Sequence, residues 1–121
     1  MTSEFLADTY AYIEILRKNP RYQRYKDAKL FTTTIHLSEL IYYFLRVGEE
    51  KRVSLVKKLF GDCVHIQFST IISAMKFKLA NKKHKLSYAD CIGYALACEL
   101  NIPFLTGDEK FEGLANVEFI K

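Results

Sequence analysis

The sequence predicts an α/β fold, a three-layer α/β/α sandwich around a mostly parallel sheet of four to five strands. Short apolar runs alternate along the chain with longer segments of helical spacing, as in parallel sheets covered by helices on both faces. Apolar residues make up 50% of the 121 residues, which is enough for the core of such a sandwich. We expect one domain over residues 1–121, because no linker, repeat or low-complexity tract interrupts the chain.

The clearest element is the stretch 86–111, which predicts a helix, a tight turn, a short buried strand and a polar loop. Ser87 is a suitable N-cap, and Asp90 three residues later completes a capping box. Asn101 can end the helix in the left-handed conformation. The run 102–105 is short and wholly apolar, as expected for a strand that is covered on both faces.

The first half of the chain predicts two strands and three helices. Asp8 is a natural N-cap for the first helix, and Pro20 can open the second. The predicted strands are 4–7 and 30–33, and the predicted helices are 9–16, 21–29 and 34–47.

The second half predicts two further helices before the central stretch and one strand on each side of it. Gly48 separates helix 34–47 from the next one, and Ser69 is the expected cap of the helix before the basic loop 81–85. The predicted helices are 49–60 and the one capped by Ser69, and the predicted strands are 63–68 and 116–120.

Charge and cysteine content limit the partners and the cellular compartment that we expect for the protein. The net charge of +4 permits a polyanionic partner without demanding one. Cys63, Cys91 and Cys98 lie in apolar surroundings and lack metal-binding spacing, so we expect reduced core thiols. The sequence shows no signal peptide and no apolar run of about 18 residues. We therefore expect a cytoplasmic protein without a membrane span.

Four carboxylates are predicted at the carboxyl edge of the sheet. Asp8 and Asp108 follow strands, Glu39 lies early in helix 34–47, and Asp90 opens the helix before the strand that precedes Asp108. Like charges gathered in this way repel one another, and a divalent cation usually neutralises them. Because the ligands are oxygens only, Mg²⁺ or Mn²⁺ is favoured over zinc.

Each acid also has an ordinary structural explanation. Asp8 and Asp108 can cap helices, Asp90 can complete a capping box, and Glu39 can favour a helix N-terminus. The run of lysines before Asp90 can likewise be a solvated helix end or a rim that contacts phosphates. It consists of Lys76, Lys78, Lys82, Lys83 and Lys85. No phosphate loop, nucleophile elbow or catalytic Cys–His pair is visible.

Four segments in this order resemble the PIN domain family of ribonucleases, and the VapC-type toxins of toxin–antitoxin pairs in particular. They are FLADTYAYI at 5–13, LSELI at 37–41, LSYADCIGYALA at 86–97 and FLTGDEKF at 104–111. The resemblance implies a parallel α/β/α sandwich with Asp8, Glu39, Asp90 and Asp108 as the catalytic, metal-binding acids. It implies Thr9 and Thr106 as supporting residues. Tyr10 departs from the small polar residue of many relatives, and Gly93 and Gly107 suggest a site lined by little besides acids.

The resemblance implies a Mg²⁺- or Mn²⁺-dependent endoribonuclease. One or two cations held by carboxylates activate water and stabilise the leaving oxygen of a phosphodiester. We expect Lys82, Lys83 and Lys85 to contact the RNA substrate. A housekeeping RNA-processing nuclease, or a catalytically silent binding module on the same scaffold, shares every residue named. A response-regulator receiver is excluded because the third predicted strand ends in Phe-Ser-Thr without a carboxylate.

Helix 34–47 suggests a protein partner as well. Its segment Leu-Ile-Tyr-Tyr-Phe-Leu, residues 40–45, is apolar on every face, whereas one core-facing stripe needs only part of it. Burial between the sheet and helix 49–60 is one explanation. The other is an interface, at which we place Tyr43 and Phe44. The resemblance implies an antitoxin at this surface and a homodimer.

Overall fold

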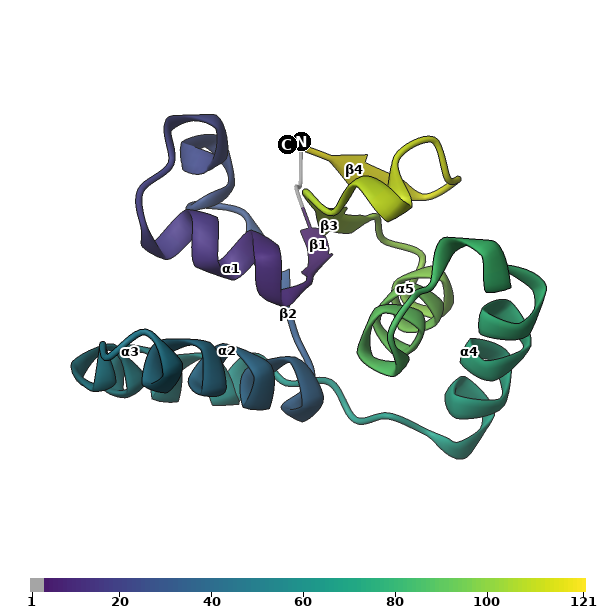
Figure 1. Cartoon of the computed structure of the whole chain (residues 1–121), viewed down its shortest axis with the longest axis horizontal. Coiled ribbons are helices and arrows are strands. Elements are labelled where there is room, and N and C mark those ends of the chain that lie inside the picture. The colour runs from purple at the N-terminus through teal and green to yellow at the C-terminus, as the bar shows by residue number, and fades with distance from the viewer. Residues whose placement is uncertain (1–3) are drawn as a thin grey trace.

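The structure, a computed structural model, describes residues 4–121 as a sheet between two groups of helices (Figure 1). Its four strands are all parallel and run in the order β2-β1-β3-β4. The strands are β1 (Glu4–Ala7), β2 (Lys29–Phe31), β3 (Phe104–Thr106) and β4 (Val117–Phe119). The predicted α/β sandwich with a parallel sheet is therefore confirmed.

Helices cover both faces of this sheet. In Figure 1, α1 and the α2–α3 pair lie on one side, while α4 and α5 lie on the other. The α-helices are α1 (Thr9–Leu16), α2 (Thr34–Arg46), α3 (Val53–Lys57), α4 (Phe68–Ala80) and α5 (Tyr88–Leu100). Short 3₁₀ helices join them: η1 (Pro20–Tyr25), η2 (Glu50–Arg52), η3 (Lys58–Asp62), η4 (Lys82–His84) and η5 (Glu109–Phe111).

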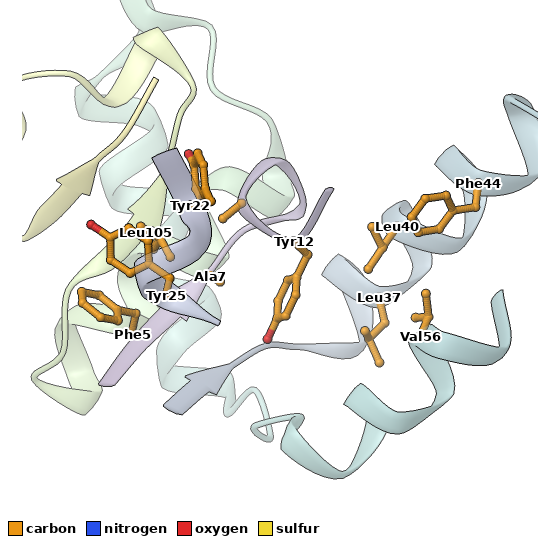
Figure 2. Packing of buried hydrophobic residues seen from close by; sticks show 11 residues of the cluster. Phe5, Ala7, Tyr12, Tyr22, Tyr25, Leu37, Leu40, Phe44, Val56 and Leu105 are labelled. Carbon is orange, nitrogen blue, oxygen red and sulfur yellow. The ribbon is translucent and has the colours of Figure 1, made fainter. Parts of the chain in front are cut away.

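Alternating residues of the central strands build two separate cores. Phe5 and Ala7 belong to the core under α1 and α2, whereas Leu6 belongs to the core under α4 and α5. Figure 2 shows Tyr12 lying between the strand residues of the first core and the side chains that α2 and α3 contribute. Phe44 of α2 is completely buried there, and a side chain of this kind stabilises the fold by about 1.5–3 kcal/mol.

The predicted strand 63–68 is wrong. Only Cys63 pairs with the sheet, through a single bridge to Thr32. Thr33 caps α2 with its side chain, so the edge strand ends before a second pair can form. The chain then crosses to α4, which begins at Phe68 with Gln67, and not Ser69, at the N-cap.

Several predicted elements are shorter than expected. The helical part of the segment 21–29 is only η1, and its last residue already belongs to β2, while 49–60 breaks into η2, α3 and the start of η3. The expected strand 30–33 is shifted to β2, 116–120 contracts to β4, and helix 34–47 ends one residue earlier as α2. Loop 81–85 contains η4. The expected strand 102–105 begins only at Phe104, because Pro103 before it has no N–H to donate.

Other local predictions hold. Ser87 and Asp90 form both hydrogen bonds of the capping box, and Asn101 is left-handed, with φ of 60°. Cys91 is buried, but Cys63 is half-buried and Cys98 is exposed, so the three thiols are not all in the core. Within residues 4–121, no helix combines the length and the apolar character needed to cross a bilayer.

Candidate functional site

The carboxyl ends of β1 and β3 bring two of the predicted acids together. These strands are parallel neighbours in the centre of the sheet. Asp8 follows β1 directly, Asp108 lies two residues beyond β3, and the Asp8 N–H donates to the Leu105 carbonyl at 3.1 Å. The chain order changes direction between β1 and β3, which is where open α/β sheets place their ligands.

Asp8 is a buried carboxylate, with only 5% of the residue exposed. Its Oδ1 accepts from the Ala11 N–H at 2.9 Å, which caps α1, and its Oδ2 accepts from the Thr106 hydroxyl at 2.5 Å. Burial, together with the nearby charges of Asp90 and Asp108, raises its pKa to about 7, although both hydrogen bonds oppose the change. Within residues 4–121, no positive charge stabilises the ionised form of the Asp8 carboxylate.

Thr106 joins the two strand-end acids. Its buried hydroxyl donates to Asp8 and accepts from the backbone N–H of Asp108 at 3.0 Å. Asp108 in turn accepts from the Lys110 N–H at 3.0 Å through Oδ1 and caps η5. Thr106 thus orients one acid directly and the other through its backbone.

Asp90 approaches the same edge from α5. As third residue of the helix, it accepts from the Ser87 N–H through Oδ2 at 2.9 Å, while its own N–H donates to the Ser87 hydroxyl at 3.0 Å. Its effect on the pKa of Asp8 shows that the two charges interact. The capping box therefore fixes the direction of a carboxylate that also belongs to the site.

Glu39 is connected to the site through Thr9. The Thr9 hydroxyl, next to Asp8 in the chain, donates to Glu39 Oε1 at 2.7 Å and lies 3.4 Å from the His36 carbonyl. This bond ties α1 to α2. Glu39 is exposed and is not among the charges that shift the pKa of Asp8, so it lies further out than Asp90 and Asp108.

These four acids, here called the acid rim, have oxygen atoms suited to a divalent cation. In Asp90, Asp108 and Glu39, one carboxylate oxygen accepts an orienting hydrogen bond, and the other accepts none from residues 4–121. Among residues 4–121, no lysine or arginine forms an ion pair with any member of the rim. In that part of the chain, no three acid, histidine or cysteine groups lie close enough together to hold a metal ion. The chemistry of the donors, which are oxygens only, suits Mg²⁺ or Mn²⁺ better than zinc.

A buried histidine sets the separation of the helices that carry Glu39 and Asp90. A Cβ on Gly93 of α5 would lie 2.9 Å from both the His36 ring and the Phe104 ring. The Thr33 hydroxyl lies 2.7 Å from His36 Nδ1 and accepts from the His36 backbone N–H at 3.2 Å, so Thr33 orients the ring. Burial lowers the pKa of His36 to about 4, which keeps it neutral.

Tyr10 closes another side of the rim. A Cβ on Gly107 would overlap the Tyr10 ring, so this glycine permits a close contact. Burial raises the pKa of the Tyr10 phenol, and the charges of Glu14, Asp8 and Asp108 act in the same direction. The expectation that Gly93 and Gly107 leave the site nearly bare is therefore wrong, because a side chain packs on each. The contact between Tyr10 and Gly107 was not predicted from the sequence. The available signal was the aromatic residue two positions after Asp8.

The predicted RNA-contacting lysines lie before α5. Lys82 and Lys83 belong to η4, Lys85 follows with a left-handed φ of 52°, and all three are exposed. Tyr88, which sequence reasoning did not single out, is exposed beside them at the start of α5.

An apolar groove of about 710 Å³ lies between α2, α3 and η3. We call it the α2–α3 groove. Its walls include Leu37, Ile41, Val56 and Phe60. Phe44 does not reach any surface, which corrects its predicted place at an interface, and the exposed large apolar residues of α2 are Tyr42 and Leu45. Tyr43 is half-buried and accepts from Arg17.

The fold and the rim together define an α/β protein with an acidic site at a strand switch point. The family model described as "PIN domain" matches residues 5–117, so the chain belongs to the PIN domain family. Members of this family are generally nucleases.

Two solved structures are similar in fold. One is a toxin–antitoxin complex from Klebsiella pneumoniae, with 18% identity, a TM-score of 0.74, and coverage of 94% of this chain and 95% of that one. The other is PAE2754 from Pyrobaculum aerophilum, with 16% identity, a TM-score of 0.66, and coverage of 99% and 91%. No curated protein matches the chain.

Proposed function

We infer that this chain is a Mg²⁺- or Mn²⁺-dependent endoribonuclease that hydrolyses RNA phosphodiesters at the acid rim. One observation carries the proposal. Asp8 and Asp108 follow the neighbouring strands β1 and β3, the charge of Asp90 contributes to the raised pKa of Asp8, Glu39 is linked to them through Thr9, and none of the four has an ion-pair partner within residues 4–121. A phosphodiester could not approach such a site without a cation, because the negative charges would repel it.

The residues of the rim have separate roles in this proposal. We assign Asp8 and Asp90 as direct ligands, and Asp108 and Glu39 as ligands that bind directly or through water. A divalent cation held there supplies an activated water and stabilises negative charge on the leaving oxygen. Thr106 and Thr9 hold the carboxylates of Asp8 and Glu39 in place.

The remaining carboxylate oxygens orient the attacking water by accepting its hydrogen bond. Lys82, Lys83 and Lys85 are proposed to contact phosphates of the RNA. We place this activity in the cytoplasm, since all three cysteines are free.

Cleavage of a labelled single-stranded RNA in Mn²⁺ tests this activity. We expect Asp90→Asn and Asp108→Asn to lower the rate by about 100-fold or more while circular dichroism stays unchanged, because each variant removes a charge with little change in shape. Glu112→Gln is the control, since Glu112 is exposed outside the rim. If Asp90→Asn cleaved as fast as wild type, the assigned site would be wrong.

We further propose that the enzyme is the toxin of a toxin–antitoxin pair and forms a homodimer. The similarity in fold to a toxin–antitoxin complex supports the first part. The α2–α3 groove is the proposed seat for an apolar segment of the antitoxin. That partner can inhibit by directing an arginine or lysine toward Asp8 and Asp108, or by covering the rim.

A protein encoded by the neighbouring gene, with a DNA-binding N-terminus, is the partner to test. We expect it to bind wild type and to lose affinity for Phe60→Ser, whose side chain lines the groove and is 65% exposed. Phe68→Ser on α4 is the control, at a ring that is 76% exposed and does not line the groove. Light scattering on the isolated chain should give twice the monomer mass of 14.1 kDa.

Growth distinguishes the toxin from a housekeeping nuclease. Induction of the toxin alone should arrest bacteria, and co-induction of its partner should restore growth. A housekeeping nuclease would leave growth unchanged, and a silent binding module would lack cleavage altogether.

A further inference from the structure

A cleft of about 380 Å³ lies between the end of α4, η4 and the start of α5, the helix that carries Asp90. Its volume is in the range of roughly 300–1,000 Å³ typical of small-ligand sites. Lys78, Lys82, Lys85, Leu86 and Tyr88 are among its lining residues, and we call it the lysine cleft. Tyr88 is the first residue of α5 and Asp90 the third, so the cleft and the rim share one helical turn.

The surrounding segment concentrates the positive charge of the protein. Residues 63–89 contain five lysines and no aspartate or glutamate. The other 94 residues contain 13 lysines or arginines and 14 acids, so the excess charge of the chain comes from this segment. An anionic ligand is therefore attracted to the side of the rim where the cleft lies.

The lysines of this segment differ in their pairing from two arginines on the opposite group of helices. Arg17 and Arg52 both pair with Glu49. None of the five lysines in residues 63–89 takes part in an ion pair within the described chain, residues 4–121. An external anion can therefore bind their ammonium groups without breaking an ion pair.

Tyr88 adds an aromatic surface to these cations. It is 66% exposed, and its ring takes part in no aromatic pair within residues 4–121. Lys78 Nζ lies 4.9 Å from the ring centroid and also donates to the Leu86 carbonyl. The ammonium group is thus held beside a ring that has free surface for stacking.

We propose that the lysine cleft is a nucleotide subsite, in which an unpaired base stacks on Tyr88 and the adjoining phosphates contact Lys82 and Lys85. This deepens the proposed nuclease function and rests on it for the identity of the polymer as RNA. Aromatic stacking beside lysines is the way in which proteins bind single strands without reading their sequence. A base within a duplex has no free face for Tyr88, so the subsite selects single-stranded or looped segments next to the scissile bond.

Equilibrium binding of a labelled single-stranded DNA twelve-mer in EDTA tests the subsite without cleavage. We expect Tyr88→Leu to weaken binding by about 5- to 10-fold and Tyr88→Phe to stay within about twofold of wild type, because phenylalanine retains the ring. Single-stranded RNA of the same sequence should respond equally, since neither stacking nor phosphate contact involves the 2′-hydroxyl. A hairpin whose bases are all paired, apart from a minimal loop, should compete poorly.

The lysines are tested by charge-matched substitutions. Lys82→Gln and Lys85→Gln should each weaken binding and reduce its salt dependence by about one phosphate contact. Lys76→Gln on α4 is the matched control, because it removes the same charge from an exposed residue outside the cleft. Equal losses for Lys76, Lys82 and Lys85 variants would show a diffuse field and overturn the subsite.

Failure of the subsite can be told apart from failure of the nuclease proposal. Tyr88-dependent binding without any metal-dependent cleavage by wild type retains the subsite and overturns the nuclease. Cleavage and binding that are both unchanged in Tyr88→Leu retain the nuclease and overturn the subsite. A titration up to about 100 µM protein detects dissociation constants as weak as roughly 1 mM. If neither single strand binds in that range, the subsite is also overturned.

Discussion

The inner and outer acids of the rim carry the same chemical group in different surroundings. Asp8 is 5% exposed, and both of its oxygens accept hydrogen bonds from the chain. Glu39, Asp90 and Asp108 are exposed or half-buried, and in each only one oxygen accepts a hydrogen bond from the described part of the chain. Burial raises the pKa of Asp8 to about 7. The burial of a carboxylate, more than its place in a cluster, decides whether its charge opposes folding.

This difference has a consequence for metal binding. A nearby divalent cation favours the ionised form of Asp8, and ionised Asp8 in turn favours the cation. The outer acids add charge and free oxygens without a comparable penalty in folding free energy. We therefore expect substitutions of the inner and outer acids to affect activity alike and stability in different ways.

Asp8→Asn is expected to have the largest effect. It removes the charge of a direct ligand, so cleavage in Mn²⁺ should fall by about 1,000-fold, equivalent to about 4 kcal/mol. The rate of RNA cleavage at saturating Mn²⁺ measures this, with Glu112→Gln as the control. A variant that regained the full rate at higher Mn²⁺ would show that Asp8 tunes affinity and is not needed for the chemistry.

The pH dependence of stability should separate Asp8 from the outer acids. The folded protein keeps a proton on Asp8 up to pH about 7, whereas the unfolded chain releases it near 3.8, the ordinary pKa of an aspartate side chain. Stability in EDTA should therefore fall as pH rises from about 4 to 8, by roughly 3–4 kcal/mol relative to Asp8→Asn.

Urea denaturation of both proteins across that range measures the difference. His36, with a pKa lowered to about 4, acts in the opposite direction, because its neutral folded form loses stability as pH falls below about 6.5. The subtraction cancels His36, since both proteins contain it. Parallel curves for the two proteins would contradict the raised pKa of Asp8.

Thr106→Val should show how far hydrogen bonding stabilises the buried Asp8. In this variant Asp8 stays buried but loses one of the two groups that donate hydrogen bonds to it. The variant also removes the acceptor for the Asp108 N–H, so we expect a loss of about 2 kcal/mol in unfolding free energy. Thr32→Val is a close control, because the Thr32 hydroxyl is equally buried but has no hydrogen-bond partner within residues 4–121. Thermal melts that shifted equally for both would show that the lost hydrogen bonds have no special role.

Asp90→Asn should have the smallest effect on stability. Asparagine keeps an oxygen that can accept from the Ser87 N–H, so we expect a change below about 0.5 kcal/mol despite the loss of activity. Ser87→Ala removes the other half of the capping box and should lower the stability by about 1 kcal/mol. A large loss in Asp90→Asn would mean that its charge stabilises α5 through the helix dipole.

Local signals in the sequence predicted much of this fold. The capping box of Ser87 and Asp90 and the left-handed Asn101 depend on hydrogen bonds between residues close in the chain, so α5 was predicted with its correct bounds. The positions of Asp8 and Asp108 after apolar strands were visible for the same reason. The false strand 63–68 had an apolar pattern, but its neighbour β2 ends at Phe31, and beyond it only Thr32 forms a bridge before Thr33 caps α2.

The sequence by itself determined which groups are available: four acids in order, two threonines beside them and a run of lysines without acids. The tertiary structure decided their surroundings, because burial and partners depend on residues far away in the chain. Burial raises the pKa of Asp8, and its side chain accepts a hydrogen bond from Thr106, which lies 98 positions away in the chain. Tyr88 and Lys78 face one cleft only because α4 packs along α5. Such contacts follow from the packing of the layers, which no local pattern specifies.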